Sequence, residues 1–131
     1  MSLQSWLNDG WLSEHKTSFA EIDELFSVVD RDLKDCRVSE LSPDWRLNIA
    51  YNAALQASTA ALAACGFRAA RDSHHYRVIQ SLAYTIKAEK NLILQFDRFR
   101  KKRNIGGYVQ AGMFQCLLTF KKRKARQKAI K

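Results

Sequence analysis

Apolar residues recur along most of the chain three or four positions apart, which is the period of an α-helix. The first clear stretch follows Ser18, which with Glu21 fits a capping box at a helix N-terminus. The stretch ends near Lys34 and Arg37, where cations favour the negative end of the helix dipole. Its apolar face is predicted to consist of Phe19, Ile22, Leu25, Phe26, Val29, Leu33 and Cys36.

A second helix is predicted from Ser42-Pro43-Asp44 to about Cys65. Its start combines an N-cap, a proline at the first helical position and an early acid. Gly66 is the expected left-handed residue after the helix end. The middle of this stretch is rich in alanine, which lets a neighbouring helix approach closely, so we expect it to lie in a bundle core.

A third helical stretch begins at Ser73, after a predicted loop over Arg68–Asp72, and extends to Asn104. A single helix over 73–104 would be about 48 Å long at a rise of about 1.5 Å per residue. This is too long for a compact domain of this size. We therefore predict a break in the polar stretch Lys87–Asn91, although no Gly or Pro marks it.

The two ends of the chain differ in pattern from its middle. Residues 1–16 place Leu3, Leu7 and Trp11 four apart and are predicted to dock on the main body, with a short helix ended by Asn8-Asp9-Gly10. A last helix is predicted over Ala111–Ala125, merging into a basic tail, residues 121–131. With one Pro and five Gly, the 131 residues predict a single all-α domain, a four- to five-helix up-and-down bundle.

Charge separates the chain into two parts. Residues 1–97 hold all 13 acidic residues and 10 Lys and Arg, whereas residues 98–131 hold 12 Lys and Arg and no acid. The net charges are therefore −3 and +12, a distribution typical of proteins that bind a polyanion. The tail 121–131 fits either this role or a solvated terminus.

The sequence also argues against several classes of site. Cys36, Cys65 and Cys116 lie far apart without metal-ligand spacing, so we expect neither a disulfide framework nor a metal site, and interpret all three as buried thiols. No cofactor motif, nucleophile elbow or phosphate loop is present. The N-terminus lacks a signal-peptide pattern and no stretch has the length of a membrane span, which predicts a cytoplasmic protein without a membrane partner.

The segment FDRFRKKRNIGGY, residues 96–108, contains the most informative chemistry. Arg103 continues the apolar stripe Leu92–Phe96–Phe99, so its guanidinium either binds an anion or a carboxylate, or extends from the helix end to solvent. Asn104 is expected to end the helix, and Gly106-Gly107 turns the chain so that Tyr108 returns toward Arg103. Arg98 and Arg100 flank the segment as candidate phosphate ligands, Arg100 being the better placed. Lys101 is expected to pair with Asp97.

Arg103-Asn104, followed after a short spacing by Tyr108, resembles a variant of the HEPN signature. In that family an Arg, often followed by Asn, precedes a His by four to six residues, and Tyr108 stands where the His would be. His74-His75-Tyr76, at the start of the preceding helix, adds to the resemblance. The similarity extends loosely over the whole predicted bundle.

The resemblance implies a metal-independent ribonuclease or a toxin component of a toxin–antitoxin system. It also implies an RNA substrate, a homodimer and a cognate nucleotidyltransferase antitoxin. In such a site Arg103 would stabilise the scissile phosphate, and a His would transfer the proton. A phenol is a poor base at neutral pH, so Tyr108 instead suggests hydrogen bonding or stacking. His75 is the candidate substitute base, provided that the helices before and after the predicted break pack antiparallel.

Three classes of function remain on the sequence alone. The first is a HEPN-like ribonuclease or toxin with Arg103, Asn104, Tyr108 and His75 at its site. The second is a non-catalytic module of the same fold that binds RNA or a nucleotidyltransferase. The third is a helical interaction protein whose basic tail is incidental.

Overall fold

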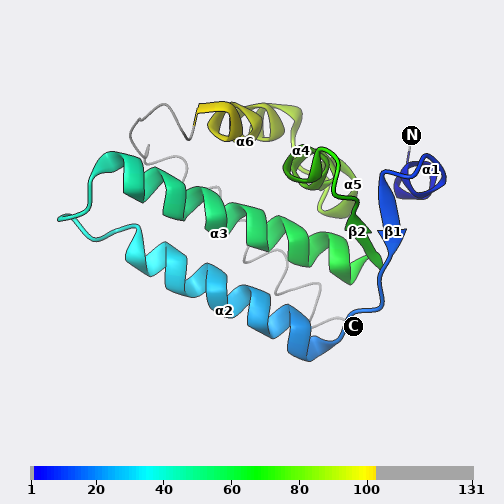
Figure 1. Cartoon of the computed structure of the whole chain (residues 1–131), viewed down its shortest axis with the longest axis horizontal. Coiled ribbons are helices and arrows are strands. Elements are labelled where there is room, and N and C mark those ends of the chain that lie inside the picture. Colours follow the sequence, from blue (N-terminus) through cyan, green and yellow to red (C-terminus); the bar gives the residue numbers. More distant parts are fainter. Residues whose placement is uncertain (1, 103–131) are drawn as a thin grey trace.

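A computed structural model describes residues 2–102, and Met1 and residues 103–131 lie outside the described part. This part is mostly helical, which confirms the predicted all-α class. Its longest elements are α2 (Phe19–Asp35) and α3 (Pro43–Ala64). They form an antiparallel hairpin that extends along the molecule (Figure 1).

The helix starts of this hairpin confirm the local signals in the sequence. The Ser18 hydroxyl accepts a hydrogen bond from the Glu21 backbone N–H at 3.1 Å, and Ser42 likewise caps α3 from the Trp45 N–H at 3.3 Å. Each bond satisfies one of the backbone donors that a helix start leaves without an intrahelical acceptor. The Ser18–Glu21 pair is only half of a capping box, because the Glu21 carboxylate bonds elsewhere.

Polar contacts fix α2 against α3. Asn52 of α3 donates to the buried Asp32 carboxylate of α2 at 2.7 Å. At the turn between the helices, Arg46 Nε donates to the Cys36 carbonyl at 2.8 Å, which satisfies an acceptor at the end of α2. The register of the hairpin therefore rests on hydrogen bonds as well as on apolar packing.

The end of α3 agrees with the predicted glycine termination. Gly66 adopts φ of 94°, in the left-handed region. The preceding cap residue, Cys65, is exposed, so its interpretation as a buried thiol is wrong. Cys36 is buried as expected, and its burial raises the pKa of the thiol. Cys116 lies outside the described residues.

The structure contains two short strands that the sequence pattern does not predict. Strand β1 (Leu12–Glu14) pairs antiparallel with β2 (Phe67–Ala69), with Leu12 opposite Ala69 and Glu14 opposite Phe67. The loop predicted over Arg68–Asp72 therefore begins too early. Strands of three residues are too short to show the alternation by which strands are recognised.

The N-terminal segment is attached through this sheet and through aromatic packing. Helix α1 (Leu3–Asn8) is capped by Ser2, and its Trp6 is 5% exposed within the main core cluster. The Arg77 guanidinium lies 3.6 Å from the centre of the Trp11 ring, a cation–π contact. The N-terminal segment is therefore docked on the main body, as expected, through the Trp6 ring, the β1–β2 pairing and the Arg77–Trp11 contact.

The third helical stretch is divided into α4 (His74–Gln80), α5 (Leu82–Thr85) and α6 (Lys90–Lys102). The break predicted over Lys87–Asn91 is found at residues 86–89, so α6 begins slightly earlier than predicted. Within the break, Lys87 adopts a left-handed φ of 56°. A second interruption at Ser81 was not predicted. Ser73, where this stretch was predicted to begin, occupies the N-cap position of α4, but its backbone is left-handed and its side chain makes no cap hydrogen bond, so an interpretation of Ser73 as a capping residue is wrong.

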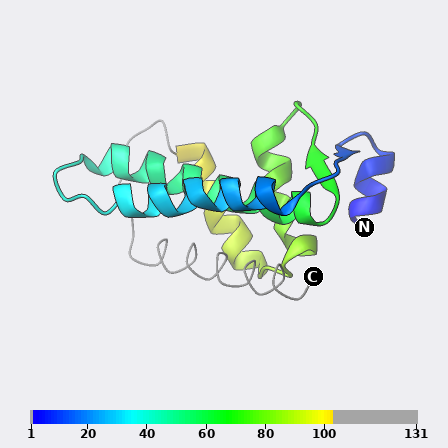
Figure 2. The same ribbon diagram turned by 90° about the horizontal axis from the view of Figure 1, so that it is seen from below.

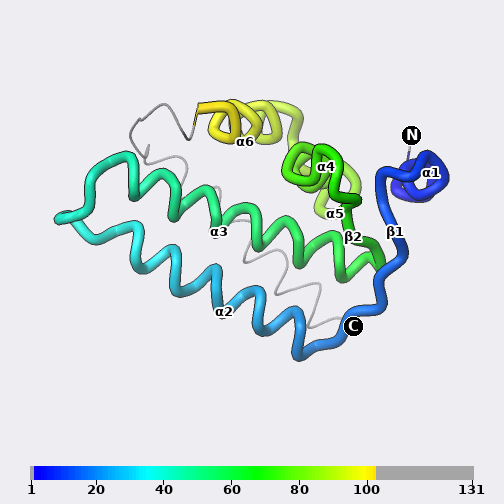
Figure 3. Tube along the Cα trace, in the orientation of Figure 1, coloured from blue at the N-terminus to red at the C-terminus, as the bar shows by residue number. Residues whose placement is uncertain are grey.

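Helix α3 lies between α2 on one side and the α4 and α6 helices on the other (Figure 1; the same path is traced in Figure 3). This central position explains why so many of its alanines are buried. Viewed from below, α4 and α6 run in opposite directions (Figure 2). No helix within residues 2–102 is long and apolar enough to cross a membrane. The helix predicted over Ala111–Ala125 and the tail 121–131 lie outside the described residues.

Candidate functional site

The start of α4 packs against α3 through a tyrosine–histidine hydrogen bond. The Tyr51 hydroxyl lies 3.2 Å from Nδ1 of His75, and the Tyr51 side chain is 1% exposed. The Tyr51 ring also meets Phe96 of α6 edge-on, with ring centres 5.8 Å apart. His75 is therefore oriented by a buried phenol that itself contacts α6.

The last turns of α6 lie beside the same end of α4. The guanidinium of Arg100 lies 5.5 Å from the centre of the Tyr76 ring. Together with the Tyr51–Phe96 contact and the opposite directions of α4 and α6, this satisfies the packing condition on which the choice of His75 depended. His75 thus lies near the last described turns of α6, whereas its proximity to Arg103 stays a prediction because Arg103 lies outside the described residues.

Arg100 is less available to bind phosphate than the sequence predicts. Its Nε donates to the buried Asp97 carboxylate at 2.7 Å, and Lys101 Nζ lies 3.4 Å from the other carboxylate oxygen. Burial raises the pKa of the Asp97 carboxyl, but the bonds and charges of Arg100 and Lys101 outweigh it and hold the pKa below its ordinary value. The predicted Asp97–Lys101 pair is present. Arg100 acts mainly in this ion-pair network and against Tyr76.

The remaining predicted site residues are placed as follows. Arg98 is exposed on α6, as a phosphate ligand requires. Arg103, Asn104 and Tyr108 lie outside the described residues, so their arrangement stays a prediction. Arg103 follows Lys102, the last residue of α6, directly in sequence.

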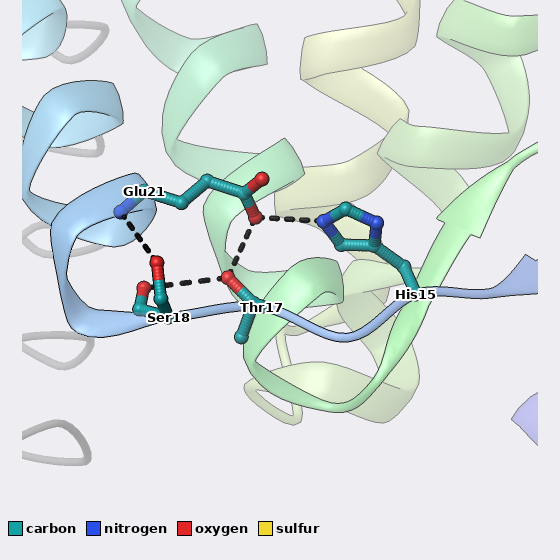
Figure 4. Close-up of polar contacts among 4 residues, drawn as sticks. All are labelled: His15, Thr17, Ser18 and Glu21. Atoms are coloured by element: carbon teal, nitrogen blue, oxygen red, sulfur yellow. Dashed lines mark hydrogen bonds and ion pairs between the residues drawn. The ribbon is translucent and has the colours of Figure 1, made fainter.

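A second polar cluster, absent from the sequence-based prediction, lies at the start of α2. The Glu21 carboxylate oxygen Oε1 lies 2.7 Å from His15 Nε2 and accepts a hydrogen bond from the Thr17 hydroxyl at 2.6 Å (Figure 4). His15 immediately follows β1, and its backbone N–H donates to the Gly66 carbonyl at 2.8 Å. The cluster therefore joins the N-terminal segment to α2 near the β1–β2 sheet.

The pKa of Glu21 predicts a pH-dependent contribution of this cluster to stability. Hydrogen bonds from Thr17 and His15 lower that pKa below its ordinary value. A carboxyl with a lowered folded-state pKa stabilises the fold above its unfolded-state pKa and loses this effect as the pH falls through the folded-state value. We expect Glu21→Gln to lower the thermal midpoint by about 2 °C near pH 7, since the pair is partly exposed.

Comparison of thermal midpoints near pH 7 and near pH 3 tests this expectation. The difference between the wild-type protein and Glu21→Gln should shrink at the lower pH, because the Glu21 carboxyl loses its charge as the pH falls through its lowered folded-state pKa. Glu24→Gln, which changes an exposed carboxylate on the same helix, is the matched control. An equal difference at both pH values would show that the charge of Glu21 is not responsible.

Neither the sequence comparisons nor the structural comparison connects the chain to a known group. No protein-family model, curated protein or solved structure matches it. Within residues 2–102, no group of three or more His, Cys, Asp and Glu side chains is arranged to hold a metal ion. The functional argument therefore depends on the residues of the chain itself.

Proposed function

We propose that this chain is an RNA-directed protein of HEPN type, with its site where the start of α4 meets the end of α6. The observation that supports the proposal best is the antiparallel packing that holds His75 beside the last turns of α6. Arg103 and Asn104 follow those turns in sequence, and the 34 residues from Arg98 onward carry a net charge of +12. The imidazole of His75 thus lies at the end of the fold where the first cationic residues of this segment, within 98–102, are found.

Each residue of the proposed site has a distinct role. Arg103 contacts the scissile phosphate, and Arg98 extends the phosphate-binding surface. Asn104 and Tyr108 hydrogen-bond or stack on the RNA. Arg100 is held by Asp97 of the same helix and packs on Tyr76 of α4, so its role is to join α6 to α4 rather than to contact phosphate.

Cleavage would depend on the tautomer of His75. When Nδ1–H donates to the Tyr51 oxygen, Nε2 carries the lone pair that a general base needs to accept the 2′-hydroxyl proton. When Tyr51 donates to Nδ1, Nε2 carries the hydrogen and acts only as a donor. Tyr51 thereby has the position of an orienting residue behind a catalytic histidine.

The second candidate function is RNA binding without cleavage. It is favoured by Tyr108, a weak base at the position of the family histidine, and by the commitment of Arg100 to Asp97. The resemblance further leads us to propose a homodimer with a nucleotidyltransferase partner, acting in the cytoplasm without a metal or other cofactor. In the non-catalytic form, the module binds RNA or this nucleotidyltransferase.

The experiment is to incubate the purified full chain with tRNA and mRNA and to measure both binding and cleavage. We expect RNA affinity that decreases with salt, because phosphate contacts release counterions. Arg103→Ala and Arg98→Gln should each weaken binding about tenfold and reduce the salt dependence by about one counterion. Arg31→Gln, an exposed arginine on α2, is the control and should bind normally.

Cleavage distinguishes the two candidate functions. Products formed by the wild-type chain, and abolished in Arg103→Ala and His75→Ala, would establish the ribonuclease. Salt-sensitive binding without products would establish the binding module, and cleavage gained by Tyr108→His would then indicate an altered active site. Equal RNA affinity in the wild-type protein, Arg98→Gln and Arg103→Ala would refute the proposed site.

A further inference from the structure

A cavity lies on the side of the molecule that contains the His15–Glu21 cluster. It has a volume of about 420 Å³ and lies between the start of α2, the last turns of α3, strand β2 and the first turns of α4. Its apolar walls include Leu25, Leu62 and Val78, one from each of the three helices. This volume falls in the range of small-molecule sites, about 300–1,000 Å³.

Basic side chains also line the cavity. Arg68 and Arg71 line the cavity and are exposed, and among the described residues no carboxylate lies within ion-pair distance of either guanidinium. His74, at the start of α4, lies beside them. The cavity thus combines an apolar interior with a cationic rim.

Glu21 is the single carboxylate among the described lining residues, and the charge of Arg68 is one of the weaker influences that lower its pKa. Its Oε1 is engaged by both His15 and Thr17 (Figure 4). Its ion pair within 4 Å is with His15, and it acts on Arg68 only through the longer-range charge interaction. The positive charge of the rim therefore remains available to a ligand.

We propose that this cavity binds a small amphipathic anion, in which a carboxylate or phosphate group is joined to an apolar body. Arg71 and Arg68 would bind the anionic group, since guanidinium forms strong charge-assisted hydrogen bonds to such oxygens. The apolar body would lie against Leu25, Leu62 and Val78 and be removed from water.

This site is distinct from the proposed RNA site, although the two share the first turn of α4. His74 lines the cavity, whereas the next residue, His75, bonds to Tyr51 on the α6 side. The variants that test the two sites can therefore be separated. Arg71 belongs to the cavity and Arg98 to the exposed face of α6.

The test is titration calorimetry of the full chain with octanoate, octyl phosphate, octanol and inorganic phosphate. Octanoate and octyl phosphate should bind at one site. Octanol, which lacks the anionic group, and inorganic phosphate, which lacks the apolar chain, should bind at least about tenfold more weakly. Arg71→Gln should weaken octanoate binding about tenfold and leave RNA binding unchanged. Arg98→Gln, the matched control, should do the reverse.

A second variant tests the apolar part of the cavity. Leu25→Trp places a larger side chain on a partly buried lining position and should abolish octanoate binding while circular dichroism remains helical. Three results would each overturn the proposal. These are equal binding of octanol and octanoate, binding of inorganic phosphate as tight as that of octyl phosphate, and no binding of either amphipathic anion. None of these results bears on RNA binding, so the two proposals fail independently.

Discussion

Replacing Tyr51 with alanine is expected to lower the free energy of unfolding by about 3–5 kcal/mol, as for other large aromatic residues in cores. The Tyr51 side chain is 1% exposed and lies at the point where α3, α4 and α6 meet. Its removal leaves a cavity beside Phe96 and deprives His75 of its hydrogen-bond partner. Urea denaturation followed by circular dichroism measures the change.

The conservative variant Tyr51→Phe distinguishes the contribution of the hydroxyl to stability from that of the ring. It keeps the packing on Phe96 and should cost about 1 kcal/mol, the net contribution of a typical hydrogen bond. In a double-mutant cycle with His75→Ala, the two changes should be non-additive, because each removes the same bond. Additive changes, or a loss below about 1 kcal/mol for Tyr51→Ala, would contradict this account of the α3–α4–α6 junction.

The second large effect is expected at Trp6. Its ring meets Trp11 and Tyr84 edge-on, with centres 5.7 and 5.4 Å away, and it is 5% exposed. Trp6→Ala should lower the free energy of unfolding by about 3 kcal/mol or more. Since Trp6 attaches the segment that contains β1, amide hydrogen exchange should also accelerate in β1 and β2.

Trp45→Ala is the matched control for this prediction. Trp45 is 64% exposed at the start of α3, so its replacement should change stability by no more than about 0.5 kcal/mol. The comparison distinguishes loss of a buried contact from loss of a tryptophan as such. Similar effects of the two substitutions would show that α1 is not anchored as described.

The helix boundaries that the sequence predicts well are those determined by neighbouring residues. Ser18, Ser42-Pro43 and Gly66 act on backbone groups within a few positions, so their effects can be recognised without the fold. The break at Ser81 and the left-handed Ser73 could not be predicted in this way. Both occur where α4 and α5 adjust to α3 and the sheet, which is a tertiary effect.

The residues of the candidate sites also differ in how far the sequence alone predicts their positions. The position of His75 beside α6 followed from one topological condition, antiparallel packing, which the structure satisfies. The sequence predicts Arg100 as a phosphate ligand, whereas in the structure it pairs with Asp97, three residues earlier on the same helix. The sequence gives no signal for His15, because its partner Glu21 belongs to another element and the adjoining cavity is lined by residues from several segments. Periodicity within one helix contains no signal for such a site.

The proposed RNA site is tested most directly by nuclear magnetic resonance of the ¹⁵N-labelled chain during titration with a short single-stranded RNA. The account predicts chemical-shift changes at the start of α4 and along the last turns of α6, including His75, Tyr76 and Arg98. Signals from the start of α2 should stay in place. An RNA that binds without moving the α4 and α6 signals, or that moves those of α2 instead, would contradict the central claim.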